Sequence, residues 1–171
     1  KIEPLSIKGL SLKSSIFKAL DSRDHLINTP YHSFSYIIKF LRESALDPDV
    51  RTIKITLYRL SKISNVISSL INAAKNGKKV IVQIELQARF DETNNINYAK
   101  QLQTAGVNLI FGIPGLKVHS KICVIEKNIE SGTKRYGFVS TGNFNEDTAT
   151  LYTDYSLFTA DQKILKEVNR V

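Results

Sequence analysis

The chain has 171 residues, of which 42% are hydrophobic and 9% aromatic, and it carries a formal net charge of +8. This length suits one domain with a sizeable core, and the composition argues against extended disorder. No apolar run reaches the roughly eighteen residues of a membrane-spanning helix, and no block of about five basic residues indicates a nucleic-acid-binding tail.

Residues 1–30 carry weak patterning, and we interpret them as a linker from an upstream domain, with the domain itself over 31–171. Ser33 is predicted to cap a helix whose apolar residues recur at helical spacing over 34–45, until Asp47-Pro48 ends it. A β-rich run over 52–59 follows.

The rest of the chain alternates strand and helix patterns. The run 79–87 is apolar enough for a central strand covered on both faces. We predict helices over 66–74, about 95–105 and after Asp161, and strands over 107–111, 116–126, 135–140 and 153–159. Asn76-Gly77 is a C-cap signal that is expected to end the first of these helices. This order predicts an α/β fold whose mixed sheet is parallel where helices cross over and antiparallel near the hairpin. In such sheets ligands bind beyond the strand ends.

The positive charge indicates either an anionic partner or a solvated lysine-rich surface, and charge alone does not decide between them. Cys123 lies within an apolar pattern, which is typical of a buried thiol in a reducing compartment. We therefore expect a cytoplasmic protein, with contact to the inner membrane face left open. Because the sequence begins at Lys1 and contains no Met, we also expect a fragment of a longer chain.

The residues with the clearest chemical potential are His119 and Lys121. If 116–126 is a strand, both side chains point to the same face, about 7 Å apart. Two titratable side chains on one face of a buried strand favour a cavity, because burial without partners is costly. A neutral imidazole beside a fixed positive charge suits a phosphoryl group. The alternative is a hydrogen-bonded core histidine.

Arg59 and Arg89 each follow an apolar strand, where a guanidinium group can grip phosphate oxygens in a bidentate way. The segment Thr141-Gly142-Asn143 exposes backbone N–H groups that can hold an anion. We expect Arg59, Arg89 and Asn143 to converge on one crevice. The alternatives are surface arginines, and ordinary turn or cap roles for Asn143 and Asn145.

The motif His119-Ser-Lys121 with Glu126, followed by Thr141-Gly-Asn143-Phe-Asn145, resembles the His-x-Lys-x4-Asp…Gly-Ser-x-Asn signature of the phospholipase D superfamily. Glu replaces the usual Asp, and Thr-Gly replaces Gly-Ser. Six segments also resemble, in order and spacing, the first C-terminal catalytic domain of type-1 polyphosphate kinases: 56–59, 73–80, 85–92, 114–121, 140–146 and 151–155. This resemblance implies a phospholipase-D-like mixed β-sheet flanked by helices. It also implies reversible transfer of the terminal phosphate of ATP to inorganic polyphosphate.

The resemblance also implies roles for individual residues. His119 would become phosphohistidine, and Lys121 would assist as a second catalytic residue. Phosphate and ATP binding would fall to Arg59, Arg89, Asn143, Asn145 and Tyr152. The two arginines correspond to the family's magnesium site. Because arginine has no acceptor atom, we expect them to bind the phosphates that carry Mg²⁺.

The expected partners are ATP or ADP, inorganic polyphosphate, the remaining domains of the same polypeptide and a second copy in a homo-oligomer, without nucleic acid. We expect the isolated fragment to be inactive, because part of the site would lie in the missing domains. One alternative is a phospholipase-D-type phosphodiesterase that works as a dimer. A second is a basic anion-binding module without catalysis.

Overall fold

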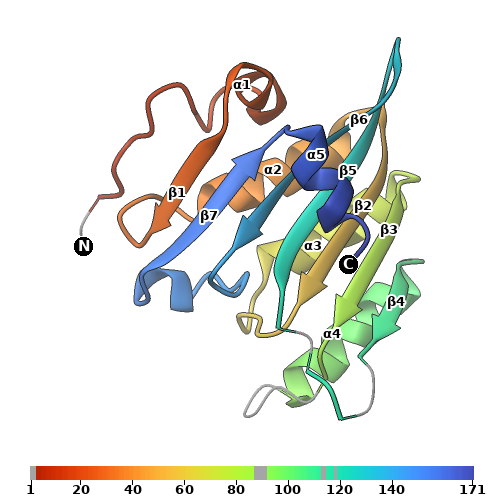
Figure 1. Cartoon of the computed structure of the whole chain (residues 1–171). Helices are drawn as coiled ribbons and strands as arrows, with labels where there is room; N and C mark the ends of the chain where they lie inside the picture. The colour runs from red at the N-terminus through yellow and green to blue at the C-terminus, as the bar shows by residue number, and fades with distance from the viewer. Residues whose placement is uncertain (1–2, 87–91, 113–114, 118) are drawn as a thin grey trace.

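The computed structural model describes residues 3–86, 92–112, 115–117 and 119–171. Its helices are α1 (Ile16–Ser22), α2 (Ser35–Leu46), α3 (Asn65–Lys75), α4 (Glu92–Thr104) and α5 (Gln162–Val168), with a short 3₁₀ turn η1 at Thr148–Thr150. Its strands are β1 (His25–Thr29), β2 (Val50–Leu57), β3 (Lys79–Ile84), β4 (Asn108–Phe111), β5 (Lys121–Ile129), β6 (Gly132–Ser140) and β7 (Asp154–Thr159). Figure 1 shows their arrangement.

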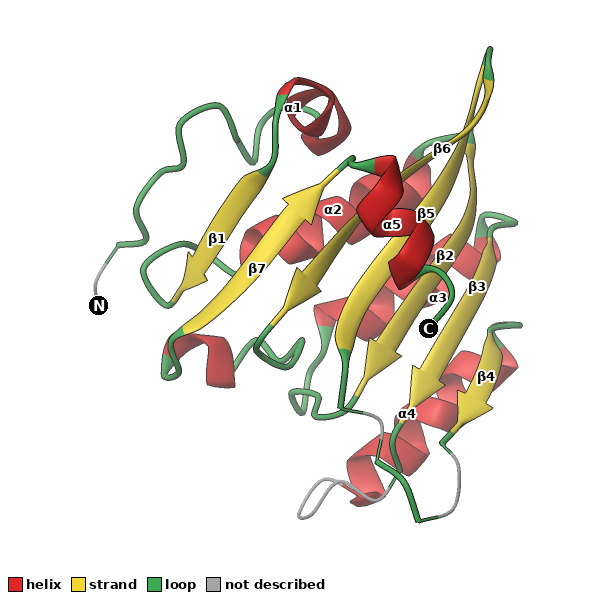
Figure 2. Ribbon diagram, viewed as in Figure 1, coloured by secondary structure: helices red, strands yellow, loops and turns green. Residues whose placement is uncertain are grey.

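Within the described residues, the strands form one sheet in the order β1-β7-β6-β5-β2-β3-β4. The pairs β2–β3 and β3–β4 are parallel, and the pairs from β2–β5 to β7–β1 are antiparallel. Parallel neighbours need a crossover, which α3 and α4 supply, whereas a short turn joins the antiparallel strands β5 and β6. The predicted mixed sheet is therefore confirmed (Figure 2).

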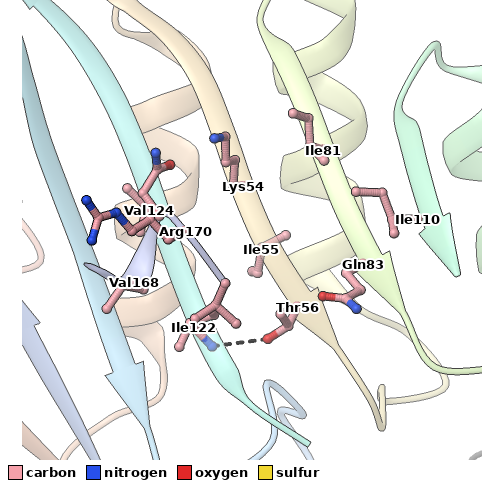
Figure 3. Close-up of a pocket in the computed structure, with 12 residues that line it drawn as sticks. Lys54, Ile55, Thr56, Ile81, Gln83, Ile110, Ile122, Val124, Val168 and Arg170 are labelled. Carbon is pink, nitrogen blue, oxygen red and sulfur yellow. Dashed lines mark hydrogen bonds between the residues drawn. The ribbon is translucent and has the colours of Figure 1, made fainter. Parts of the chain in front are cut away.

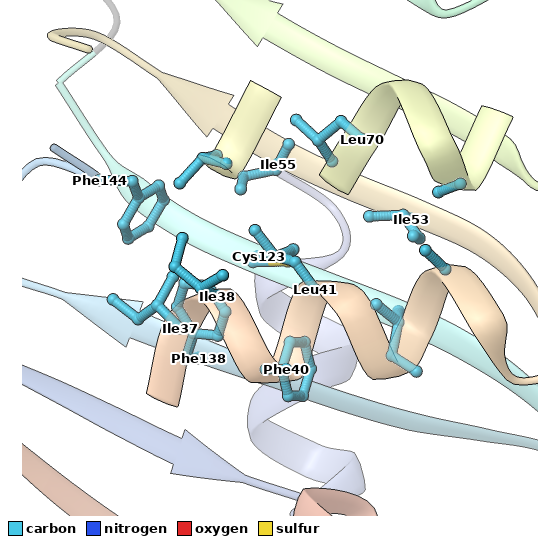
Figure 4. Close-up of a cluster of buried hydrophobic side chains, with 14 of the residues drawn as sticks. Ile37, Ile38, Phe40, Leu41, Ile53, Ile55, Leu70, Cys123, Phe138 and Phe144 are labelled. Atoms are coloured by element: carbon cyan, nitrogen blue, oxygen red, sulfur yellow. The ribbon is translucent and has the colours of Figure 1, made fainter. Parts of the chain in front are cut away.

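The core lies between the sheet and the helices α2, α3 and α4, which cover one face, while α5 lies on the other face (Figure 1). At its centre Phe138 of β6 contacts Phe40 of α2 and Phe158 of β7, at ring-centroid distances of 5.3 and 4.7 Å. Figure 4 shows Phe40 and Phe138 beside Cys123, Ile53 and Leu41. Cys123 is fully buried, so the expected buried thiol is confirmed, and this burial raises the pKa of the thiol.

The expected linker over residues 1–30 is corrected by the structure. Residues 16–22 form α1, and His25–Thr29 form β1, which pairs with β7 along its whole length. Phe17, Leu20 and Ile27 are at most 3% exposed. These apolar side chains belong to the same core as the rest of the domain, so no boundary separates residues 16–29 from the later elements.

Several predicted boundaries hold, and one strand is misplaced. Asp47 ends α2, and Gly77, at φ +80°, follows the last turn of α3, as the Asn-Gly pair indicated. The strand predicted over 79–87 ends at Ile84. It was expected to be central, but it lies next to the edge strand β4, and its burial alternates between buried and half-buried residues. Its apolar run therefore reflects one buried face rather than two.

Within the described residues, no helix is both long and apolar enough to cross a membrane.

Candidate phosphoryl-transfer site

The predicted site residues that the structure describes lie at one end of the sheet. At this end β2 and β3 finish, β5 begins, β6 finishes and β7 begins (Figure 2). The loop after β2 carries Tyr58 and Arg59, the segment before β5 carries His119, and the turn after β6 carries Asn143. The sheet thus brings together residues far apart in the sequence, in accordance with the rule that ligands bind beyond strand ends.

The strand predicted over 116–126 begins only at Lys121, so His119 lies in the segment before β5. The expected same-face geometry within one strand is therefore wrong. His119 is exposed, whereas Lys121 is only 6% exposed and donates through Nζ to the carbonyl of His119 at 2.5 Å. The two residues remain in contact, but through the His119 backbone rather than through a shared strand face.

Thr56 holds the start of β5. Its hydroxyl donates to the carbonyl of Ser120 at 2.6 Å and accepts from the backbone N–H of Ile122 at 3.1 Å. Figure 3 shows the second of these bonds. The side chain takes the place of ladder hydrogen bonds that β2 would otherwise form, because a hydroxyl both donates and accepts. The start of β5, and the residues just before it, are thereby fixed to β2.

The ring of Tyr58 lies among three positively charged or ionisable side chains. Its centroid is 5.8 Å from that of His119, with the rings at 76°, and 5.7 Å from Nζ of Lys121. The guanidinium carbon of Arg59 lies 5.8 Å from the same ring. His119, Lys121 and Arg59 thus lie around one tyrosine ring. The predicted convergence of Arg59, Arg89 and Asn143 stays a prediction, because Arg89 lies outside the described residues.

Lys121 is the buried charge of the site. Burial lowers the pKa of its ammonium group, and the carboxylate of Asp154, at the start of β7, acts in the opposite direction. Asp154 also accepts a hydrogen bond from the hydroxyl of Thr141 at 2.8 Å. A buried ammonium group with a nearby but incomplete counter-charge is arranged to attract an anion.

The turn after β6 is built from residues with distinct tasks. Gly142 lies against Asp154, where an added Cβ would stand 2.3 Å from the carboxylate, so any other residue would displace the Asp154 side chain. Phe144 is 2% exposed and packs edge-on against Phe138 in the core. Asn145 accepts from the backbone N–H groups of Asp147 and Thr148, at 2.9 and 3.0 Å, so the turn role weighed for it is present.

Asn143 differs from Asn145. Its Oδ1 atom is buried and has no hydrogen-bond partner among the described residues. Buried polar atoms usually have partners, so such an atom marks a place where a ligand or water can bind. This observation supports the predicted ligand-binding role of Asn143 more than that of Asn145.

Glu146 ties this turn to the loop that carries Arg59, a role that was not predicted for it. Its carboxylate accepts from the hydroxyl of Ser61 at 2.6 Å and from the backbone N–H of Asn65 at 2.6 Å. Because Asn65 begins α3, the negative carboxylate also interacts favourably with the positive N-terminal end of that helix. A glutamate at this position gives no signal in the sequence, because both partners lie more than eighty residues earlier in the chain.

Replacing Glu146 by Ala is expected to lower the free energy of unfolding by about 1–3 kcal/mol, because the Ser61 hydroxyl and the Asn65 N–H lose their acceptor. Glu146→Gln should lose less, since it keeps an acceptor oxygen. Denaturant titration measures both, with Glu130→Ala on the exposed β5–β6 hairpin as the control. Equal stability of Glu146→Ala and the control would contradict the link.

The loop after β2 is also held from the side of α4. The amide of Asn95 donates to the carbonyls of Tyr58 and Glu85, at 2.8 Å each. The hydroxyl of Tyr98 accepts from Ser64 N–H at 3.1 Å and lies 2.8 Å from the carbonyl of Lys62. Residues 58–64 are therefore fixed by side chains of one helix, which positions Arg59 beside Tyr58.

Some predicted residues are not placed in this cluster. Arg89 lies outside the described residues. Tyr152 is 63% exposed, between η1 and β7 at the same end of the sheet. Glu126 forms an ion pair with Arg135 across the β5–β6 hairpin, with an oxygen–nitrogen distance of 2.9 Å, which accounts for its charge.

A hollow of about 210 Å³ on the sheet face that carries α5 is a separate feature (Figure 3). Its walls are mostly aliphatic, with Ile55, Ile81, Ile110, Ile122 and Val124 among them, and His119 is not part of it. No group of three His, Cys, Asp or Glu side chains that could hold a metal ion occurs in the described part of the chain.

Comparison with known proteins identifies the family. The profile of the polyphosphate kinase C-terminal domain 1 matches residues 15–171. The chain belongs to the polyphosphate kinase family. The match begins at residue 15, which agrees with the placement of α1 and β1 inside the domain.

Two curated polyphosphate kinases illustrate the similarity. The one from Escherichia coli (strain K12) is 53% identical over 155 residues, which are 91% of this chain and 22% of that protein. The one from Vibrio vulnificus (strain YJ016) is 46% identical over 170 residues, which are 99% of this chain and 24% of that protein. The chain thus spans about a quarter or less of the length of these relatives.

Solved structures agree in fold. The crystal structure of polyphosphate kinase from Porphyromonas gingivalis matches 99% of this chain and 28% of that chain, with a TM-score of 0.85 and 39% identity. A phospholipase D family member, Nuc from Salmonella typhimurium, matches 86% of this chain and 89% of that chain, with a TM-score of 0.64 and 16% identity. The predicted phospholipase-D-like fold is therefore confirmed, with the second likeness bearing on fold alone.

Proposed function

We propose that this chain is the first C-terminal catalytic domain of a longer ATP:polyphosphate phosphotransferase. In this proposal the terminal phosphate of ATP passes reversibly to inorganic polyphosphate through a phosphohistidine at residue 119. The observation that carries the proposal is the cluster of His119, Lys121 and Arg59 around Tyr58, in a chain of the polyphosphate kinase family.

In the first step a neutral imidazole nitrogen of His119 attacks the γ-phosphorus of ATP. The nitrogen–phosphorus bond forms as the bond to the bridging oxygen breaks, and ADP leaves with that oxygen. In the second step a terminal oxygen of polyphosphate attacks the phosphoramidate and releases the imidazole. Division into two transfers is the usual advantage of covalent catalysis.

The remaining residues disperse charge on the transferring group, which is most of what phosphoryl transfer requires. Lys121 offers an ammonium group held in a buried position. Arg59 offers a guanidinium fork, and Asn143 adds a polar side chain and the backbone of its turn. We assign Arg89, Asn145 and Tyr152 to the same phosphate- and nucleotide-binding machinery on the strength of the family resemblance.

Mg²⁺ fits this site as an ion carried by the substrate phosphates. It usually keeps several waters and binds through phosphate oxygens rather than through a protein cage, which agrees with the absence of an acidic cluster among the described residues. Bound there, the ion would neutralise charge on the phosphates. Arg59 and Arg89 would hold those phosphates, since arginine cannot coordinate a cation itself.

The proposed partners are ATP or ADP, inorganic polyphosphate, the other domains of the full-length enzyme and a second copy of it. We place the enzyme in the cytoplasm, with any membrane contact peripheral.

The direct test is ATP-dependent synthesis of polyphosphate by the full-length enzyme and by the isolated 171-residue domain. We expect the full-length enzyme to extend polyphosphate and to form an acid-labile, alkali-stable phosphoenzyme, and the isolated domain to be inactive. Hydrolysis of a phosphodiester such as bis(p-nitrophenyl) phosphate without ATP or Mg²⁺, in place of synthesis, would instead support the phosphodiesterase alternative. The phospholipase-D-like fold is the observation that favours this alternative.

A further inference from the structure

Tyr58 is the residue around which the proposed site is organised, yet neither the motifs nor the proposed chemistry gives it a task. It is the first residue after β2, and its carbonyl is held by the Asn95 amide at 2.8 Å. Its ring is therefore attached to a backbone that is fixed on one side by the sheet and on the other by α4.

His119 has the opposite character. It is exposed and lies outside β5, so no ladder hydrogen bond of its own strand sets the direction of its side chain. The ring contact with Tyr58, at 5.8 Å and 76°, is an edge-to-face arrangement of the kind that aromatic pairs prefer. Such a contact restricts the rotation of an otherwise exposed imidazole ring.

The same tyrosine ring also lies within cation–π range of Lys121 and Arg59. The face of an aromatic ring carries partial negative charge and attracts cations, more strongly where water is excluded, as it is around Lys121. The ring therefore attracts both positive groups and favours their position beside His119.

We propose that Tyr58 is a positioning residue whose aromatic ring, rather than its hydroxyl, orients His119 for in-line attack and holds Lys121 and Arg59 beside the incoming phosphate. This inference rests on the proposed phosphotransferase function. A positioning role acts on the rate of the chemical step more than on substrate affinity, because small errors in the direction of attack slow a reaction strongly.

The test compares Tyr58→Phe, Tyr58→Leu and the control Tyr31→Leu in the full-length enzyme. Tyr31 is a tyrosine 53% exposed before α2, outside the site. Rapid-quench labelling with [γ-³²P]ATP measures the rate of phosphoenzyme formation and its dependence on ATP concentration. We expect Tyr58→Phe and Tyr31→Leu to stay within about two-fold of the parent, and Tyr58→Leu to fall about 10-fold or more in maximal rate with little change in the half-saturating ATP concentration.

A normal rate in Tyr58→Leu would overturn the proposal, and so would an equal loss in Tyr58→Phe, which would assign the effect to the hydroxyl. If Tyr58→Leu melts below the assay temperature, Tyr58→Met replaces it with the same expectation. Phosphoenzyme formation by the parent enzyme distinguishes failure of the proposed function from failure of the Tyr58 role. If the parent forms no phosphoenzyme, the proposed function fails; if it does and Tyr58→Leu is unimpaired, only the positioning role fails.

Discussion

Replacing His119 by Ala in the full-length enzyme is expected to abolish both phosphoenzyme formation and polyphosphate synthesis. Without the imidazole the proposed nucleophile is gone, and Lys121 and Arg59 are assigned to binding the phosphate as cations rather than to accepting it. Loss of a nucleophile typically costs several orders of magnitude in rate. Labelling with [γ-³²P]ATP and measurement of polyphosphate chain growth would both report this loss.

Because His119 is exposed, its replacement should affect activity without a large effect on stability. An exposed side chain with no structural task is expected to change stability by no more than about 0.5 kcal/mol when replaced. His32→Gln serves as the control, because His32 accepts a backbone hydrogen bond from Asn28 at 2.9 Å, in the turn between β1 and α2. Labelling that persists in His119→Ala but disappears in His32→Gln would overturn the assignment.

The second large effect is expected at Lys121. Lys121→Met should lower the turnover number about 100-fold or more, in line with the removal of one preorganised group that stabilises charge in a transition state. Methionine fills a similar volume, and burial of a charge is costly, so we expect no loss of thermal stability. Steady-state kinetics and a thermal melt of the same preparation test both statements.

Lys127 provides a matched control at the other end of the same strand. It forms an ion pair with Asp47 and lies 5.5 Å from the ring of Phe17, among structural residues. Lys127→Met should lower stability and leave the turnover number within about two-fold of the parent. The opposite pattern, with turnover lost at Lys127 and retained at Lys121, would contradict the placement of the site.

The pH dependence of turnover is expected to reflect the surroundings of Lys121. Its ammonium form binds the phosphate, so turnover should fall as pH rises through its pKa, which burial places below the ordinary 10.5. Asp154 favours the charged form, so Asp154→Asn should lower that pKa further and move the alkaline limb of the turnover profile to lower pH. The amide keeps an acceptor for Thr141. A limb that moved to higher pH would contradict the coupling.

Several helices and their ends could be predicted from the sequence, because they depend on patterns of residues close in the chain. The helical spacing of α2 and α3, the Asn76-Gly77 stop and the cap at Asp161 are all set by residues close in the chain. The strand order was not readable, because pairing of β1 with β7 depends on contacts between distant segments. The weakly patterned residues before 30 were therefore misjudged.

In the site too, local spacing could be predicted from the sequence, whereas contacts between distant residues could not. The spacing of His119, Lys121 and Asn143 indicated a phosphoryl site, and their positions at one end of the sheet agree with it. The start of β5 after His119 was not predictable, because this part of the chain is held by contacts with distant residues, such as the hydroxyl of Thr56, more than sixty positions earlier in the chain. The roles of Tyr58 and Glu146 were not predicted for the same reason, because their partners are close in space and distant in sequence.

The most direct test of the proposed mechanism is to locate the phosphate. The full-length enzyme would be incubated with [γ-³²P]ATP, digested under alkaline conditions that preserve phosphohistidine, and its labelled peptide sequenced. We predict label on His119, in the peptide that leads into Lys121 and β5. Label on a different residue, or none on His119 while polyphosphate is being made, would contradict the central claim.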